Sequence, residues 1–206
     1  IITFPVIIYL ACLTMLKGSR EKAVIFPSLF TVGSGGFASM GLSIILFLSY
    51  QNLYGYLYEK IGFLTALFML GLSVGGAASG KLISNKKAVV KLLVILTFFV
   101  LVFSLAIPAV IKLIGLAPAS TVFLFYLLII TLGTFTGMMF PLAAAAMEKD
   151  EGGADKYASY VQAFDHAGGC AGAALTGAFL LPVLGMSGSV FIIASFEICA
   201  VLIWVI

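Results

Sequence analysis

The chain has 206 residues, of which 63% are hydrophobic and 9% are charged. Soluble domains average about 45–50% apolar and about 25% charged residues, so this composition excludes a soluble globule and predicts a membrane protein. The net charge of +3 is spread over the predicted loops and does not indicate a nucleic-acid partner. The cysteines lie far apart in apolar runs without metal-ligand spacing, so neither a disulfide framework nor a metal is expected. They are Cys12, Cys170 and Cys199.

Apolar runs of roughly 20 residues cross a bilayer, and the sequence contains seven such candidates. In chain order they are Ile1–Leu16, Ala23–Tyr50, Ile61–Leu82, Leu92–Ile111, Thr121–Met147, Tyr157–Leu181 and Ser189–Ile206. Pro182 and Gly185 mark the predicted end of the sixth. We therefore expect an all-α polytopic transmembrane helical bundle of about seven helices, forming one domain over residues 1–206.

This domain is expected to contain the end of a truncated helix and a cytoplasmic loop in residues 1–22, followed by two three-helix units, 23–116 and 117–206. The orientation follows from the basic residues, because nine of the eleven lie in alternate loops. These nine are Lys17, Arg20, Lys22, Lys81, Lys86, Lys87, Lys91, Lys149 and Lys156. The positive-inside rule places them and the C-terminus in the cytoplasm, and we expect a bacterial inner-membrane location.

Glycines recur at a constant offset of 97 residues. Gly36, Gly71, Gly75 and Gly80 have counterparts in Gly133, Gly168, Gly172 and Gly177. Because each unit has three helices, this offset predicts an inverted repeat like that in each half of major-facilitator transporters. Chance alignment among 22 glycines is the alternative. Glycines four residues apart also predict close packing of helix backbones, for which we expect Gly71, Gly75, Gly80, Gly168, Gly172 and Gly177.

A candidate intramembrane polar site consists of Asp165, His166, Glu197 and Gln51, because ionisable residues in a membrane are costly and often functional. Such a cluster could pass protons. A structural role is the alternative, with Asp165 bonding a neighbouring helix and His166 reaching the headgroups. Asp165 shares a helix face with Gly168 and Gly172, so we expect it to contact another helix. Gln51 is expected at the membrane interface.

The loop Glu148–Lys156 is rich in carboxylates, which suggests either a metal or polyamine site or a solvated loop. Across the whole chain, no nucleophile–base pair, metal cluster or phosphate-binding loop can be assembled from the sequence. We therefore expect no catalytic residues and no cofactor within this chain.

Several motifs together resemble the membrane part of spermidine-synthase-like integral membrane proteins over about residues 33–186. They are Gly36-Phe37-Ala38-Ser39-Met40, Gln51 with Tyr54-Gly55-Tyr56-Leu57-Tyr58, Phe68-Met69-Leu70-Gly71-Leu72, Gly137-x-x-Phe140-Pro141-Leu142, Asp165-x-x-Gly168-x-x-x-Gly172 and Leu181-Pro182-x-x-Gly185. The resemblance implies a transporter-like helical region that accompanies a soluble aminopropyltransferase-type domain, with Asp165 and Gln51 as the matching polar positions. This chain has Ser43 where the family pattern has an acidic residue.

Three functions stay open at this point. The first is a non-catalytic membrane domain that anchors or serves a soluble synthase-like domain or partner subunit; any enzymatic activity would lie in that soluble domain. The second is a secondary transporter, or half of one, for a small solute. The third is a membrane subunit of a respiratory or electron-transfer complex, although the lone His166 cannot provide paired haem ligands. The lipid bilayer is the partner common to all three.

Overall fold

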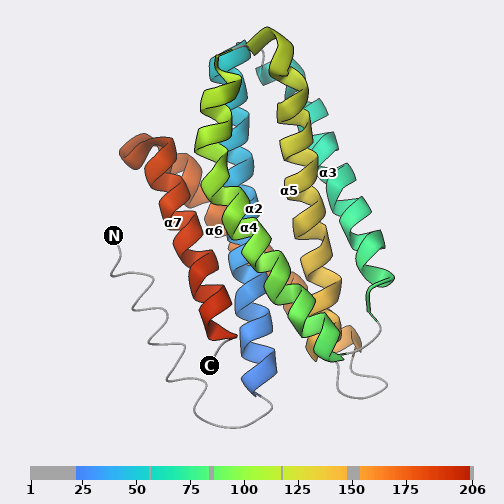
Figure 1. Cartoon of the computed structure of the whole chain (residues 1–206). Coiled ribbons are helices and arrows are strands. Elements are labelled where there is room, and N and C mark those ends of the chain that lie inside the picture. The colour runs from blue at the N-terminus through green and yellow to red at the C-terminus, as the bar shows by residue number, and fades with distance from the viewer. Residues whose placement is uncertain (1–21, 56, 84–85, 117, 148–153, 205–206) are drawn as a thin grey trace.

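The structure is a computed structural model that describes residues 22–55, 57–83, 86–116, 118–147 and 154–204. Within these ranges it contains helices and no strand. The elements are α2 (Lys22–Tyr54), α3 (Leu57–Gly80), α4 (Lys86–Ile114), α5 (Pro118–Met147), α6 (Ala154–Leu175), the π-helical turn η1 (Thr176–Leu180) and α7 (Leu181–Ile203). Figure 1 shows them as one bundle of long helices. The predicted span Ile1–Leu16 and most of the carboxylate-rich loop, residues 148–153, lie outside the described residues.

Five helical stretches of the described chain are long and apolar enough to cross a membrane, which indicates an integral membrane protein. They are Val24–Tyr54, Lys60–Gly80, Ala88–Ile114, Thr121–Met147 and Tyr157–Ile203. The predicted count of seven is therefore not supported. One predicted span lies outside the described residues, and the sixth and seventh are joined into a single helical run.

The joint between α6 and α7 differs from the sequence prediction for a physical reason. Proline lacks only an N–H that is free in the first turn of a helix, so Pro182 begins α7 instead of ending a span. The break comes at Gly185, whose φ of 68° is in the left-handed region that glycine tolerates. A straight run of 47 residues would be about 70 Å long, more than twice the bilayer core. The chain turns at this break, and α7 runs back along the bundle (Figure 1).

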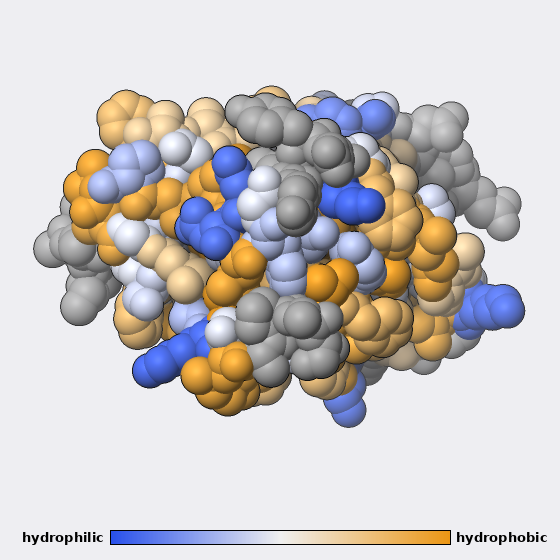
Figure 2. Space-filling view, turned by 90° about the horizontal axis from the view of Figure 1, so that it is seen from above, coloured by the Kyte–Doolittle hydropathy of each residue, from blue (hydrophilic) through white to orange (hydrophobic). Residues whose placement is uncertain are grey.

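Two helix pairs pack most extensively, α3 with α5 and α2 with α6. Helix α2 is central, since it also contacts α5 and α7 and is the most deeply buried of the candidate spans. The outer helices expose large apolar side chains such as Phe98, Leu113 and Phe123. Figure 2 looks onto one end of the bundle and shows hydrophobic residues around much of the rim, with hydrophilic residues both in the middle and at several places on the edge. This distribution suits a lipid-facing surface.

Candidate functional site

Helices α3 and α5 cross in close backbone contact at four glycines. A Cβ atom on any of the four would fall on a backbone carbonyl of the opposite helix. The pairs are Gly71 with Ile130, Gly75 with Thr134, Gly133 with Phe68 and Gly137 with Leu72. Backbones this close gain dispersion contacts that lipid cannot replace.

Helices α2 and α6 cross in the same manner. The pairs here are Gly168 with Gly33, Gly172 with Phe37 and Gly36 with Asp165. Each of these pairs corresponds to a pair of the α3–α5 crossing when 97 is subtracted from the number of the α6 residue and added to that of the α2 residue. Two glycines predicted to pack closely do not do so. A Cβ atom on Gly80 would meet open space, and one on Gly177 would be in ordinary van der Waals contact with the side chain of Ile44, at 3.7 Å.

A pocket of about 500 Å³ lies where α2, α3, α5 and α6 meet. We call it the Asp165 pocket. Its lining residues are Gly36, Ser39, Met40, Phe68, Met69, Leu72, Thr136, Asp165, His166, Gly169, Cys170 and Ala173. The pocket adjoins both glycine crossings, because Gly36 and Asp165 belong to one crossing while Phe68 and Leu72 belong to the other.

Asp165 and His166 provide the carboxyl group and the imidazole of this pocket. The Oδ2 atom of Asp165 lies 3.5 Å from Nδ1 of His166, and their side chains are 30% and 69% exposed respectively. The absence of a side chain at Gly36 makes room for Asp165, whose Oδ1 atom lies 3.0 Å from where a Cβ would be. Asp165 therefore lies against α2, as its shared face with Gly168 predicts. Its polar neighbour, however, is His166 on its own helix and not a group of α2.

The hydroxyl groups of Ser39 and Thr136 in this pocket donate their hydrogens to backbone oxygens but can still accept hydrogen bonds. Ser39 donates to the backbone oxygen of Gly36 at 3.0 Å, and Thr136 donates to that of Leu132 at 2.9 Å. Each hydroxyl oxygen keeps a free lone pair. Together with the carboxylate of Asp165, they present acceptors to whatever enters.

Glu197 lies elsewhere in the bundle. Its side chain is fully buried on α7, and neither carboxyl oxygen has a hydrogen-bond partner within the described residues. Ser34 on α2 is close enough to influence this carboxyl group, but its hydroxyl donates to the backbone oxygen of Thr31 at 3.0 Å. Glu197 and Asp165 therefore do not form one site.

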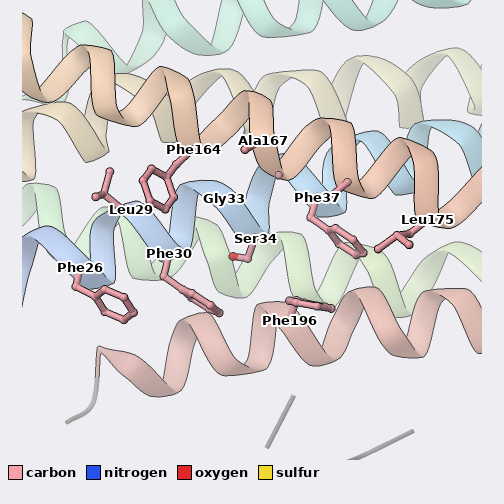
Figure 3. Close-up of a pocket in the computed structure, with 12 residues that line it drawn as sticks. Phe26, Leu29, Phe30, Gly33, Ser34, Phe37, Phe164, Ala167, Leu175 and Phe196 are labelled. Atoms are coloured by element: carbon pink, nitrogen blue, oxygen red, sulfur yellow. The ribbon is translucent and has the colours of Figure 1, made fainter. Parts of the chain in front are cut away.

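A second pocket, of about 350 Å³, is lined by residues of α2, α6 and α7 and by neither of these two acids. Figure 3 shows phenylalanine rings from three helices around it, with Ser34 among them. Phe26, Phe30 and Phe37 come from α2, Phe164 from α6 and Phe196 from α7. We call it the phenylalanine pocket.

Gln51 is in the last turns of α2, 11 residues beyond Met40, which lines the Asp165 pocket, and so about 16 Å along the helix from that pocket. It joins neither acid. Ser39 and Thr136 line the Asp165 pocket although sequence reasoning did not select them. They are themselves 97 residues apart, so the offset that relates the glycines would have pointed to them.

Among the described residues, no group of three or more His, Cys, Asp or Glu side chains could hold a metal ion. Comparison with known protein families, with curated proteins and with solved structures finds no match. The site must therefore be interpreted from its own geometry.

Proposed function

We propose that this chain is a solute-binding membrane domain of transporter-like architecture, with the Asp165 pocket as its binding site. The observation that carries this proposal is a partly exposed carboxylate and a largely exposed histidine in an apolar helical stretch. Such groups are costly against lipid, so they favour a face that lines water, a solute or another protein.

The glycine crossings support two inverted three-helix units, α2–α4 and α5–α7. An inverted repeat relates α2 to α5 and α3 to α6, so it requires the α3–α5 and α2–α6 pairs to be equivalent. The residue pairs in these crossings correspond at a constant offset of 97 residues. The Asp165 pocket lies among helices of both units, which is where transporters built from such repeats bind their substrates.

The chemistry of the pocket favours a small organic cation. Its carboxylate and its two hydroxyl oxygens are acceptors, which suit an ammonium group with several N–H donors. The ring of Phe68 in the same wall can add a cation–π contact. A polyamine fits this description and agrees with the family resemblance.

The resemblance supports a second proposal, that the domain serves a soluble aminopropyltransferase-type domain whose substrates and products are amines. Several residues that carry the resemblance form the crossings, among them Gly36, Phe68 and Gly172. The full-length gene product tests this: a nucleotide-binding βα pattern beside these helices favours it, and a second six-helix half favours a transporter alone.

The cytoplasmic orientation of the C-terminus is part of the proposal. Figure 1 places the C-terminal end of α7 at the same end of the bundle as the α3–α4 connection. Lys81 and Lys91 flank that connection, which the positive-inside rule assigns to the cytoplasm.

Spermidine is the probe for the solute site, with a neutral diol of similar length as the comparison ligand. We expect spermidine to bind the detergent-solubilised protein and raise its melting temperature, since a ligand at 100 times its Kd stabilises by about 2.7 kcal/mol. Asp165→Asn should reduce this shift to half or less at the same spermidine concentration, while Glu197→Gln, which changes an acid outside the pocket, should retain it.

Equal binding of the neutral diol would refute the cationic class of solute. Equal binding of spermidine by the wild type and Asp165→Asn would refute the assigned pocket. The absence of spermidine binding in the wild type would remove polyamines from the proposal.

A further inference from the structure

Glu197 is a carboxyl group whose burial has no structural explanation. It is fully buried in α7, and its two oxygens make no hydrogen bond within the described residues. The solute site does not use it, because it does not line the Asp165 pocket. If this position served packing alone, leucine or methionine would fill it without the cost of burying a polar group that has no partner.

The electrostatics of this position favour the neutral acid. Removing an ionised carboxylate from water costs several kcal/mol, and only a close cation or several hydrogen bonds can compensate. Ser34 is the one hydroxyl near it on α2, and its Oγ is 3.0 Å from the backbone oxygen of Thr31, to which it donates, so neither condition is met among the described residues. A protonated carboxyl group avoids this cost.

No described charge faces Glu197 from the elements that pack on α7, which are α2, α4 and η1. From residue 24 onwards, α2 has only tyrosines among its titratable residues, Tyr50 and Tyr54, at the far end of the helix from Ser34. The described lysine side chains of α4, Lys91 and Lys112, are near its two ends and exposed, and η1 has no titratable residue. On α7 itself, Cys199 is two positions away and so on another side of the helix.

We infer that Glu197 is a proton-binding site, which holds a proton while α7 packs against α2 and releases it when that contact opens. The step is the dissociation of a carboxylic acid into a carboxylate and a proton, which passes to water. This goes beyond solute binding and does not require the Asp165 pocket to function.

The surroundings of Glu197 provide a contact that can open. On one side, the rings of Phe37 and Phe196 lie 4.7 Å apart between α2 and α7. On the other, the indole of Trp204 donates to the hydroxyl of Thr31 at 2.9 Å. The phenylalanine pocket lies beside this contact and reaches Ser34, so the packing next to the acid is already incomplete (Figure 3). Separation of α7 would admit water next to the carboxyl group.

Infrared spectroscopy of the whole chain in phosphatidylcholine vesicles tests the inference. At neutral pH we expect a carbonyl band of a protonated carboxyl group that shifts in D₂O. The band should be absent in Glu197→Gln, which keeps the shape of the neutral acid, and present in Asp165→Asn. Raising the pH should remove the band reversibly while carboxylate bands appear.

Two results would overturn the inference. One is a wild-type spectrum identical to that of Glu197→Gln in the carboxylic-acid region, which would mean that Glu197 holds no proton. The other is a band that persists at every pH up to unfolding, which would make Glu197 an inert buried acid. Retained spermidine binding by Glu197→Gln tests the solute site separately, so the two proposals can fail independently.

Discussion

The α3–α5 and α2–α6 crossings solve the same packing problem but differ in what they place beside it. Both bring backbones together at glycines, and three of the four contacting pairs of the first crossing correspond to the three pairs of the second. Where the first crossing has Phe68, however, the second has Asp165. The next positions are Met69 and His166.

The difference between Phe68 and Asp165 at corresponding positions distinguishes residues that pack the helices from residues that can bind a solute. Because the α3–α5 crossing packs tightly with an apolar pair at these positions, an acid is not needed to hold such a crossing together. A crossing of this kind therefore does not require Asp165 and His166, and only one of the two crossings has them. That asymmetry agrees with the proposal that the α2–α6 crossing contributes polar groups to a binding site while the α3–α5 crossing serves packing.

The largest effect is expected from filling the crossings. Gly71→Leu, Gly75→Leu, Gly168→Leu and Gly172→Leu each place a side chain on opposing backbone, which cannot rotate away. Overpacking typically costs 1–3 kcal/mol and more where nothing can adjust, so we expect about 3 kcal/mol or more at each position. Thermal unfolding in detergent measures it.

Gly80→Leu is the matched control, because Gly80 is also helical but has open space around it. It should change stability by less than about 0.5 kcal/mol. If the α3 variants kept the stability of the wild type and the α6 variants did not, the two crossings would not be equivalent in packing.

A smaller effect is expected at Asp165, and on binding more than on stability. Asp165→Asn keeps the size and hydrogen-bonding capacity of the side chain but loses its charge. Hydrogen bonds to charged groups contribute about 1.5–3 kcal/mol, so spermidine affinity should fall by about 10- to 100-fold while the melting temperature changes little. Titration of wild type and variant by calorimetry gives both affinities.

Phe68→Leu is the comparison for this prediction. It keeps an apolar side chain at the position of the first crossing that corresponds to Asp165. We expect it to lower spermidine affinity only by the loss of a cation–π contact, about 0.5–2 kcal/mol. A larger loss at Phe68 than at Asp165 would show that the ring, rather than the acid, dominates recognition.

The class of fold was predictable because composition and run length are local properties. The predicted second span, Ala23–Tyr50, lies within α2, and the third to fifth agree with α3–α5 to within a few residues at most ends. The joint after α6 was not predictable in this way. Pro182 can either end a helix or begin one, and the choice depends on how the flanking turn packs.

The composition of the site depended on which helices become neighbours. The sequence places Asp165 on the glycine face of its helix, and the structure has it against Gly36. No local pattern shows that Glu197 faces a different helix pair, or that Gln51 lies too far along α2. Ser39 and Thr136 gave no signal by residue type, because hydroxyls in apolar helices commonly bond their own backbone.

A smaller effect on stability is expected at the contact of α7 with α2. The Trp204–Thr31 hydrogen bond has no counterpart 97 residues away, where the positions are occupied by Ile107 and Leu128. Trp204→Phe removes the donor and Thr31→Val the acceptor. A double-mutant cycle by thermal unfolding should give a coupling of about 1 kcal/mol. A coupling near zero would mean that this bond does not hold α7 in place.

The smallest effect is expected from the two hydroxyls of the Asp165 pocket, one on α2 and one on α5. Removing each in turn tests whether the solute contacts both helices. Ser39 and Thr136 are 97 residues apart, and the hydroxyl of each donates to a backbone oxygen of its own helix. Ser39→Ala and Thr136→Val each remove one acceptor and leave the helix intact. A hydroxyl acceptor has no charge of its own and should contribute less than the carboxylate, about 0.5–1.5 kcal/mol, so each variant should lower spermidine affinity by about 2- to 10-fold. Equal losses of affinity in the two variants would mean that the solute lies between α2 and α5. A loss confined to Ser39→Ala would place it against the α2–α6 crossing alone, and no loss in either variant would remove the hydroxyls from the site.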